Sequence, residues 1–75
     1  MIRLRVKEVA QQKGFSQGKL QRHADVDIKT IRKVYRDPFA IITTETLDRI
    51  AKALHVSVHD LIEEVDGKPE TPEKP

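Results

Sequence analysis

Residues 16–36 read SQGKLQRHADVDIKTIRKVYR, and this stretch contains the start signals of two short helices. Ser16 and Asp27 carry side-chain oxygens that can accept a hydrogen bond from a free backbone N–H group in the first turn of a helix. Each follows an apolar residue that can form a hydrophobic staple with the residue five places further along. The staple pairs are Phe15 with Leu20 and Val26 with Ile31. The sequence therefore predicts two helices joined by a three-residue corner, and the second helix is studded with basic residues.

Similar start signals occur twice more along the chain. Ile42 and Thr43 precede Leu47, and Val56 and Ser57 precede Leu61, with Asp60 completing a capping box. An earlier helix is indicated by helical spacing of largely apolar residues and by a closing glycine. Its residues are Val6, Val9, Ala10, Lys13 and Gly14. We therefore expect an all-α chain of five helices.

Charge is unevenly distributed along the 75 residues. Residues 1–37 hold ten Lys and Arg against four Asp and Glu, whereas residues 38–75 hold four against eight. A basic half that contains the helix pair favours a polyanionic partner, although a solvated charged surface would have the same composition. The chain has no cysteine, which is compatible with a reducing cytosol.

Two segments are expected from composition. Residues 1–65 are predicted to form one small domain, and residues 66–75, rich in Pro, Glu and Lys, a disordered tail. The longest wholly apolar run, residues 39–42, is far shorter than the roughly 20 residues that cross a bilayer, and no signal peptide is visible. We expect a soluble, cytoplasmic protein.

Two short helices around a sharp corner, the second of them basic, form the layout of a helix-turn-helix. The chain resembles the Cro/repressor (Xre-type) helix-turn-helix family over about residues 4–64. The matching positions are Gln17, Leu20, Ala24, Val26, Thr30, Ile31, Val34, Thr43, Leu47, Ile50, Ala51, Leu54, Val56, Ser57 and Leu61. The resemblance implies a compact, five-helix, lambda-repressor-like domain that binds operator DNA, commonly as a dimer, and regulates transcription in bacteria or phages.

The resemblance also implies which residues contact DNA. Gln17 matches a glutamine that holds a phosphate, and Arg36 looks like a second phosphate contact. Four residues match the face of the recognition helix that meets base edges in the major groove: Ile28, Lys29, Arg32 and Lys33. Lys and Arg can donate to guanine O6 and N7, and Ile can cover a thymine methyl group.

The sequence departs from the family pattern at two informative places. Asp25 occupies the corner position usually filled by glycine, and aspartate is one of the few residues that tolerate the left-handed conformation. Ala10 and Tyr35 replace an arginine and a glutamate that form an ion pair in many relatives. Because a small residue opposite a large one conserves volume, we expect Tyr35 to pack against Ala10.

Enzymatic and metal-binding functions find little support in the sequence. His55 and His59 are four residues apart, but Ser57 restarts a helix between them and no third ligand is evident. Ser16 and Ser57 are explained as helix caps, and no phosphate-binding glycine-rich loop is present. We expect neither catalysis nor a metal ion or cofactor.

The apolar connector of residues 39–42 offers a surface for a partner. Phe39 or Ile41 could join Val58 in an exposed patch that pairs two protomers, as in relatives, or the chain could dimerise only on DNA. We expect a sequence-specific DNA-binding regulator that acts as a transcriptional repressor. The alternative is a protein-interaction module, such as an antitoxin that binds a toxin partner.

Overall fold

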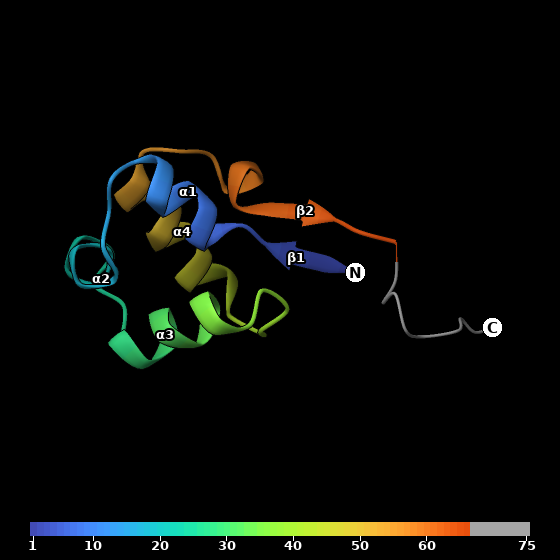
Figure 1. Cartoon of the computed structure of the whole chain (residues 1–75), viewed down its shortest axis with the longest axis horizontal. Helices are drawn as coiled ribbons and strands as arrows, with labels where there is room; N and C mark the ends of the chain where they lie inside the picture. Colours follow the sequence, from blue (N-terminus) through green and yellow to red (C-terminus); the bar gives the residue numbers. More distant parts are fainter. Residues whose placement is uncertain (67–75) are drawn as a thin grey trace.

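The computed structural model describes residues 1–66 and consists of four α-helices, one 3₁₀ turn and a two-stranded sheet (Figure 1). In chain order the elements are β1 (Ile2–Leu4), α1 (Val6–Gln12), α2 (Gln17–Ala24), α3 (Ile28–Arg36), α4 (Thr44–Leu54), η1 (Val58–Leu61) and β2 (Ile62–Glu64). Of the predicted tail, only Asp66 is among the described residues; residues 67–75 lie outside them.

The predicted caps begin three of the helices. The backbone N–H of Lys19 donates to Ser16 Oγ over 3.1 Å, and the N–H of Lys29 donates to Asp27 Oδ1 over 2.8 Å. Thr43 Oγ1 accepts from the N–H of Thr46 over 3.1 Å. The starts of α2, α3 and α4 are therefore confirmed, because each polar side chain satisfies an otherwise free donor of the first turn.

The described chain is mostly helical, as expected, but it has four α-helices instead of five and a small two-stranded sheet. Ser57 and Asp60 do form both hydrogen bonds of a capping box, but the helix they begin lasts a single 3₁₀ turn. Leu61 is fully buried, and Ile62 adopts an extended backbone with φ −132° and ψ 154°. The chain then pairs with the N-terminal segment as an antiparallel strand.

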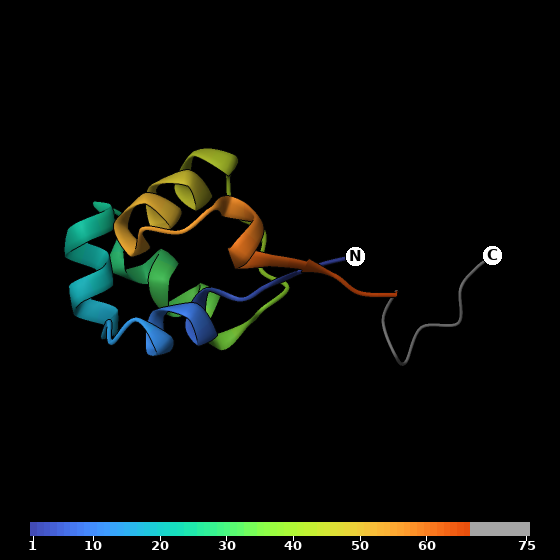
Figure 2. The same ribbon diagram turned by 90° about the horizontal axis from the view of Figure 1, so that it is seen from above.

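The two strands form an antiparallel ribbon in which Ile2 faces Glu64, Arg3 faces Glu63 and Leu4 faces Ile62. The ribbon projects from the helical body beside both ends of the described chain (Figures 1 and 2). Alternation of Ile2, Leu4 and Val6 with basic residues is a strand signal that the helix-based interpretation missed. Across the ribbon, the guanidinium of Arg3 contacts Glu63 at 3.3 Å and also Glu8 of α1 at 2.7 Å.

Glu8 gives the fold a specific acid sensitivity. The hydrogen bond from Arg3 lowers the pKa of the Glu8 carboxyl below its ordinary value of 4.5. A lowered folded-state pKa stabilises the protein above the unfolded pKa, and this contribution disappears as the pH falls through the folded value. We expect the free energy of unfolding to drop more between pH 7 and pH 3 in the unaltered chain than in Glu8→Gln. Urea denaturation at both pH values measures this, and equal drops would contradict the assignment.

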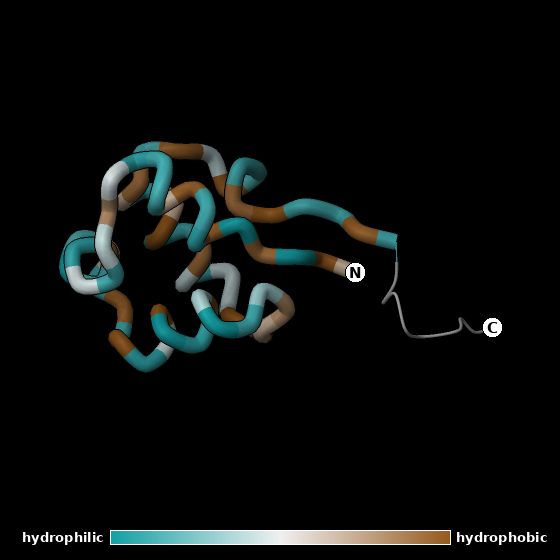
Figure 3. Tube along the Cα trace, in the orientation of Figure 1, coloured by the Kyte–Doolittle hydropathy of each residue, from teal (hydrophilic) through white to brown (hydrophobic). Residues whose placement is uncertain are grey.

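The hydrophobic core lies where all four helices meet η1 and β1. Its largest fully buried side chains come from five elements and are Leu20, Ile31, Ile50, Leu54, Leu61 and Val6. The tube in Figure 3 shows apolar segments interleaved with hydrophilic ones along every helix, as expected where one face of each helix is buried. This packing holds α3 with one face against the core and the opposite face outward.

Candidate nucleic-acid interface

The corner between α2 and α3 is three residues long, as predicted, and is closed by backbone hydrogen bonds. Asp25 adopts φ 56° and ψ 48°, so the expected left-handed conformation at this position is confirmed. The N–H groups of Asp25 and Val26 both donate to the carbonyl of Gln21, over 3.0 and 3.3 Å. The corner therefore sets the direction in which α3 leaves α2.

Arg49 of α4 fastens this corner, a role that the sequence analysis missed. Its Nη1 donates to the carbonyl oxygen of Asp25 over 3.1 Å, while its Nη2 contacts Glu45 at 3.0 Å. The spacing of Glu45 and Arg49 is a visible signal for an ion pair along one helix. This spacing does not reveal that the same guanidinium also donates to a backbone oxygen 24 residues earlier in the chain.

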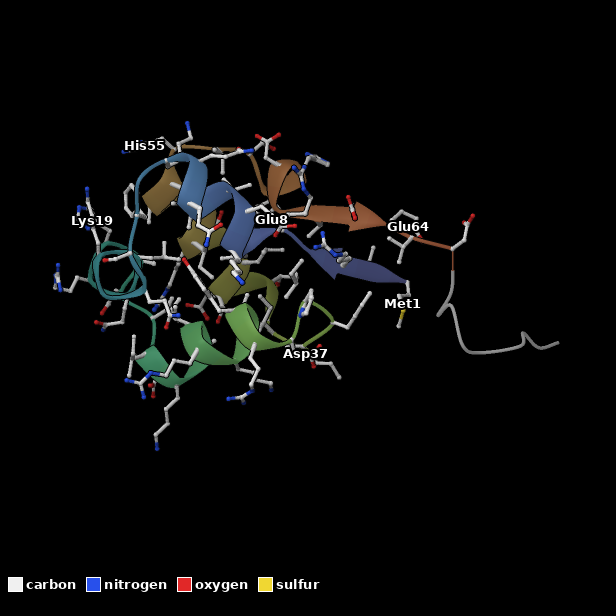
Figure 4. All side chains as sticks on the ribbon, viewed as in Figure 1. Met1, Glu8, Lys19, Asp37, His55 and Glu64 are labelled. Carbon is white, nitrogen blue, oxygen red and sulfur yellow. The ribbon has the colours of Figure 1, made fainter. Side chains whose placement is uncertain are left out.

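The outward face of α3 is a cationic surface, which we call the basic face: Lys29, Arg32, Lys33 and Arg36. All four side chains are exposed, whereas Ile31 and Val34 on the other side of α3 are buried. Because successive residues on an α-helix are about 100° apart, the four cations fall within an arc of roughly 100°. Among residues 1–66 none of the four forms an ion pair. Figure 4 shows long, nitrogen-tipped side chains that project from α3 away from the body of the molecule.

The remaining predicted contacts are the first residues of α2 and α3. Gln17 is the first residue of α2 and is exposed, directly after the Ser16 cap. Ile28 is the first residue of α3, but it is half-buried and packs against the core. Only part of its side chain is therefore accessible to a ligand of the basic face.

Comparison with known proteins gives one decisive match. The sequence of residues 5–67 matches the family model of the Cro/C1-type helix-turn-helix DNA-binding domain. The chain belongs to this family. It is thus a DNA-binding domain of the helix-turn-helix class, and such domains are typically not enzymes. A search of curated proteins found no match. No helix within the described part of this Cro/C1-type domain is long and apolar enough to span a membrane.

Tyr35 occupies the boundary between α1 and α3 in the Cro/C1-type domain. Its side chain is half-buried and packs against the core cluster that includes the fully buried Ala10. The Tyr35 hydroxyl is buried and has no hydrogen-bond partner among the described residues, and burial raises the pKa of this hydroxyl above its ordinary value. The boundary between α1 and α3 thus holds a protonated Tyr35 hydroxyl that has no acceptor among residues 1–66.

The two histidines that are four residues apart lie on different elements. His55 ends α4 in the left-handed conformation with φ 59°, and His59 lies on η1, where its Nδ1 is 3.2 Å from Ser57 Oγ. Within residues 1–66, no group of three or more His, Cys, Asp or Glu side chains is placed to hold a metal ion.

The apolar surface near the connector differs in composition from the expected one. Ile41 is 88% exposed and Phe39 is 40% exposed, but Val58 is half-buried against the core. Ile41 instead borders a groove between β1 and the start of α4, whose other apolar side chains include Ile2, Leu4 and Ile62. The ribbon, which the sequence analysis did not predict, supplies these three residues.

Proposed function

We propose that this domain is a sequence-specific transcriptional repressor that inserts α3 into the major groove of an operator. The basic face carries this proposal, because four exposed cations without partners among residues 1–66 lie opposite the buried side of one helix. A major groove about 12 Å wide admits such a helix. Occupying a promoter and thereby excluding the polymerase is the simplest route to repression for a protein that binds DNA in this way.

Each residue of the interface has a distinct role in this proposal. Lys29, Arg32 and Lys33 donate to base edges, and the accessible part of Ile28 covers a thymine methyl group. Arg36 contacts a phosphate at the end of α3. Gln17 holds another phosphate through its side chain and the free N–H groups at the start of α2. Phosphate contacts set the register on the duplex, whereas base contacts select the sequence.

Selection of binding sites from a random pool of DNA tests the proposal. We expect one enriched sequence and a linear fall of the logarithm of the binding constant with the logarithm of salt concentration. Lys33→Ala should relax the preference at particular bases, while Gln17→Ala should weaken all sites about equally. A pool without enrichment would contradict sequence-specific binding and would favour the alternative, a protein-interaction module such as an antitoxin.

A second copy of the domain is the partner that best fits the apolar groove beside Ile41. Among residues 1–66, no charged side chain lines this groove, which is unusual in a chain with 35% charged residues. Two copies can therefore approach here without like-charge repulsion. A protruding Ile41 next to an apolar groove also suits a two-fold contact, in which each copy supplies the same surface. In such a dimer the two α3 helices lie roughly 34 Å apart, one turn of DNA.

Ile41→Glu tests the dimer. A buried, unpaired carboxylate is costly, so we expect this variant to sediment as a monomer and to bind the two halves of a selected site independently. Gln12→Glu, which changes the charge equally at an exposed position of α1, is the matched control and should behave like the unaltered chain. Dimers that persist in Ile41→Glu would place the contact elsewhere.

A further inference from the structure

A cleft between α1 and α3 opens beside the basic face, and Arg36 alone of its lining residues has a role in the function proposed above. Its polar lining comes from three elements: Arg3 of β1, Lys7, Glu8 and Gln11 of α1, and Tyr35 and Arg36 of α3. Arg36 is a member of the basic face, so the cleft continues that surface onto α1.

The lining of this cleft is rich in hydrogen-bond donors. Among the described residues Glu8 supplies the one carboxylate of this lining, and the guanidinium of Arg3 already holds it at 2.7 Å. Lys7 and Arg36 form no ion pair within the described part of the chain, and both side chains are exposed. Gln11 adds an amide, and the Tyr35 hydroxyl has no acceptor among residues 1–66.

Donors in excess of acceptors, together with two free cations, suit an oxyanion rather than a cation or a neutral ligand. Phosphate is the oxyanion that lysine and arginine bind most readily in proteins that contact nucleic acids. The helical geometry of α3 places Tyr35 on the flank between its buried side and its basic face, since residue 35 lies about 100° from residue 36. A backbone passing the basic face on this side would therefore run along the cleft.

We propose that the cleft between α1 and α3 binds a phosphate group of the DNA backbone, with Lys7 and Arg36 as its cations and Gln11 as an amide donor. This inference rests on the proposed function, because it extends the same interface onto the first helix. Lys7 is then a contact residue in its own right. The α1 contact adds a point of attachment to the DNA backbone but no sequence preference.

Lys7→Met tests the inference with DNA selected by the unaltered domain. Methionine keeps the helix propensity and most of the length of the side chain but removes the charge. Loss of one neutralised phosphate should reduce the salt slope by about 0.9 and the affinity at 0.15 M salt by about fivefold, equally for selected and random DNA. At one backbone phosphate, distinct from the one assigned to Gln17, ethylation should interfere with binding of the unaltered domain and should interfere less with binding of Lys7→Met.

Lys52→Met is the matched control, because Lys52 lies on α4 away from the cleft and is paired with Asp48 at 3.1 Å. It should keep both the affinity and the ethylation pattern. Equal losses in Lys7→Met and Lys52→Met would indicate a diffuse charge effect and overturn the phosphate site. An unaltered domain that selects no DNA would instead remove the proposed function, and this inference with it.

Inorganic phosphate distinguishes the DNA backbone from a free anion. Titration into the DNA-free domain, followed by the backbone amide resonances of Lys7 and Gln11, should produce only weak, unsaturated shifts at millimolar concentration. Saturable binding of inorganic phosphate, combined with unchanged DNA affinity of Lys7→Met, would assign the cleft to a small anion and overturn the proposal.

Discussion

Arg32→Ala combined with Lys33→Ala should lower the affinity for a selected DNA site on the order of a hundredfold. Each good contact between a side chain and a base edge contributes roughly 1–3 kcal/mol to discrimination, and this variant removes two of them. The loss should be accompanied by a weaker preference for the selected sequence over random DNA. Fluorescence anisotropy with labelled duplexes at one fixed salt concentration measures both quantities.

The folded state should survive this double substitution. Both side chains are exposed and form no ion pair among residues 1–66, and alanine has the highest helix propensity. Arg22→Ala combined with Lys52→Ala removes the same charges from α2 and α4 and is the matched control. We expect only a severalfold loss in the control, from the general weakening of electrostatic attraction. If the control lost as much affinity as the α3 variant, α3 would not be the reading helix.

Leu61→Ala should lower the free energy of unfolding by about 2–5 kcal/mol. Leu61 is fully buried although it lies on a single 3₁₀ turn near the end of the described chain. Its truncation removes apolar contacts and leaves a cavity between η1 and the helices that pack on it. A chain of 75 residues has a total unfolding free energy of roughly 4–11 kcal/mol, so much of the stability would be lost. Urea denaturation followed by circular dichroism measures the change.

Ile41→Ala is the comparison for Leu61→Ala, because it also shortens an aliphatic side chain but at a position that is 88% exposed. At protein concentrations low enough for monomers, it should change the free energy of unfolding by less than about 0.5 kcal/mol. A loss in Leu61→Ala as small as the one in Ile41→Ala would mean that the side chain of Leu61 is not part of the core.

Local signals predicted the helix-turn-helix accurately. The caps at Ser16, Asp27 and Thr43 depend only on a side-chain oxygen and on backbone groups within three residues, so neighbouring residues suffice to locate them. The left-handed Asp25 is predictable for the same reason. The six candidate DNA contacts remain predictions, and the structure places five of them on exposed positions and Ile28 on a half-buried one.

Long-range partners could not be predicted in this way. The capping box at Ser57 is correct, yet the segment after it forms a strand because β1, some 60 residues earlier, offers a partner edge. A cap begins a helix but does not determine its length. Arg49 and the groove beside Ile41 depend likewise on residues that are distant in sequence.

The sequence by itself determined where α2, α3 and α4 begin, the sharp corner and the row of cations along α3, since hydrogen bonds and helical periodicity within a few residues specify them. Only the tertiary structure decided that the last described segment is a strand that pairs with β1. It likewise decided that Arg49 of α4 holds the corner and that a donor-rich cleft continues the basic face onto α1. These features require side chains and strand edges from separate parts of the chain to meet, and their meeting depends on how the core packs.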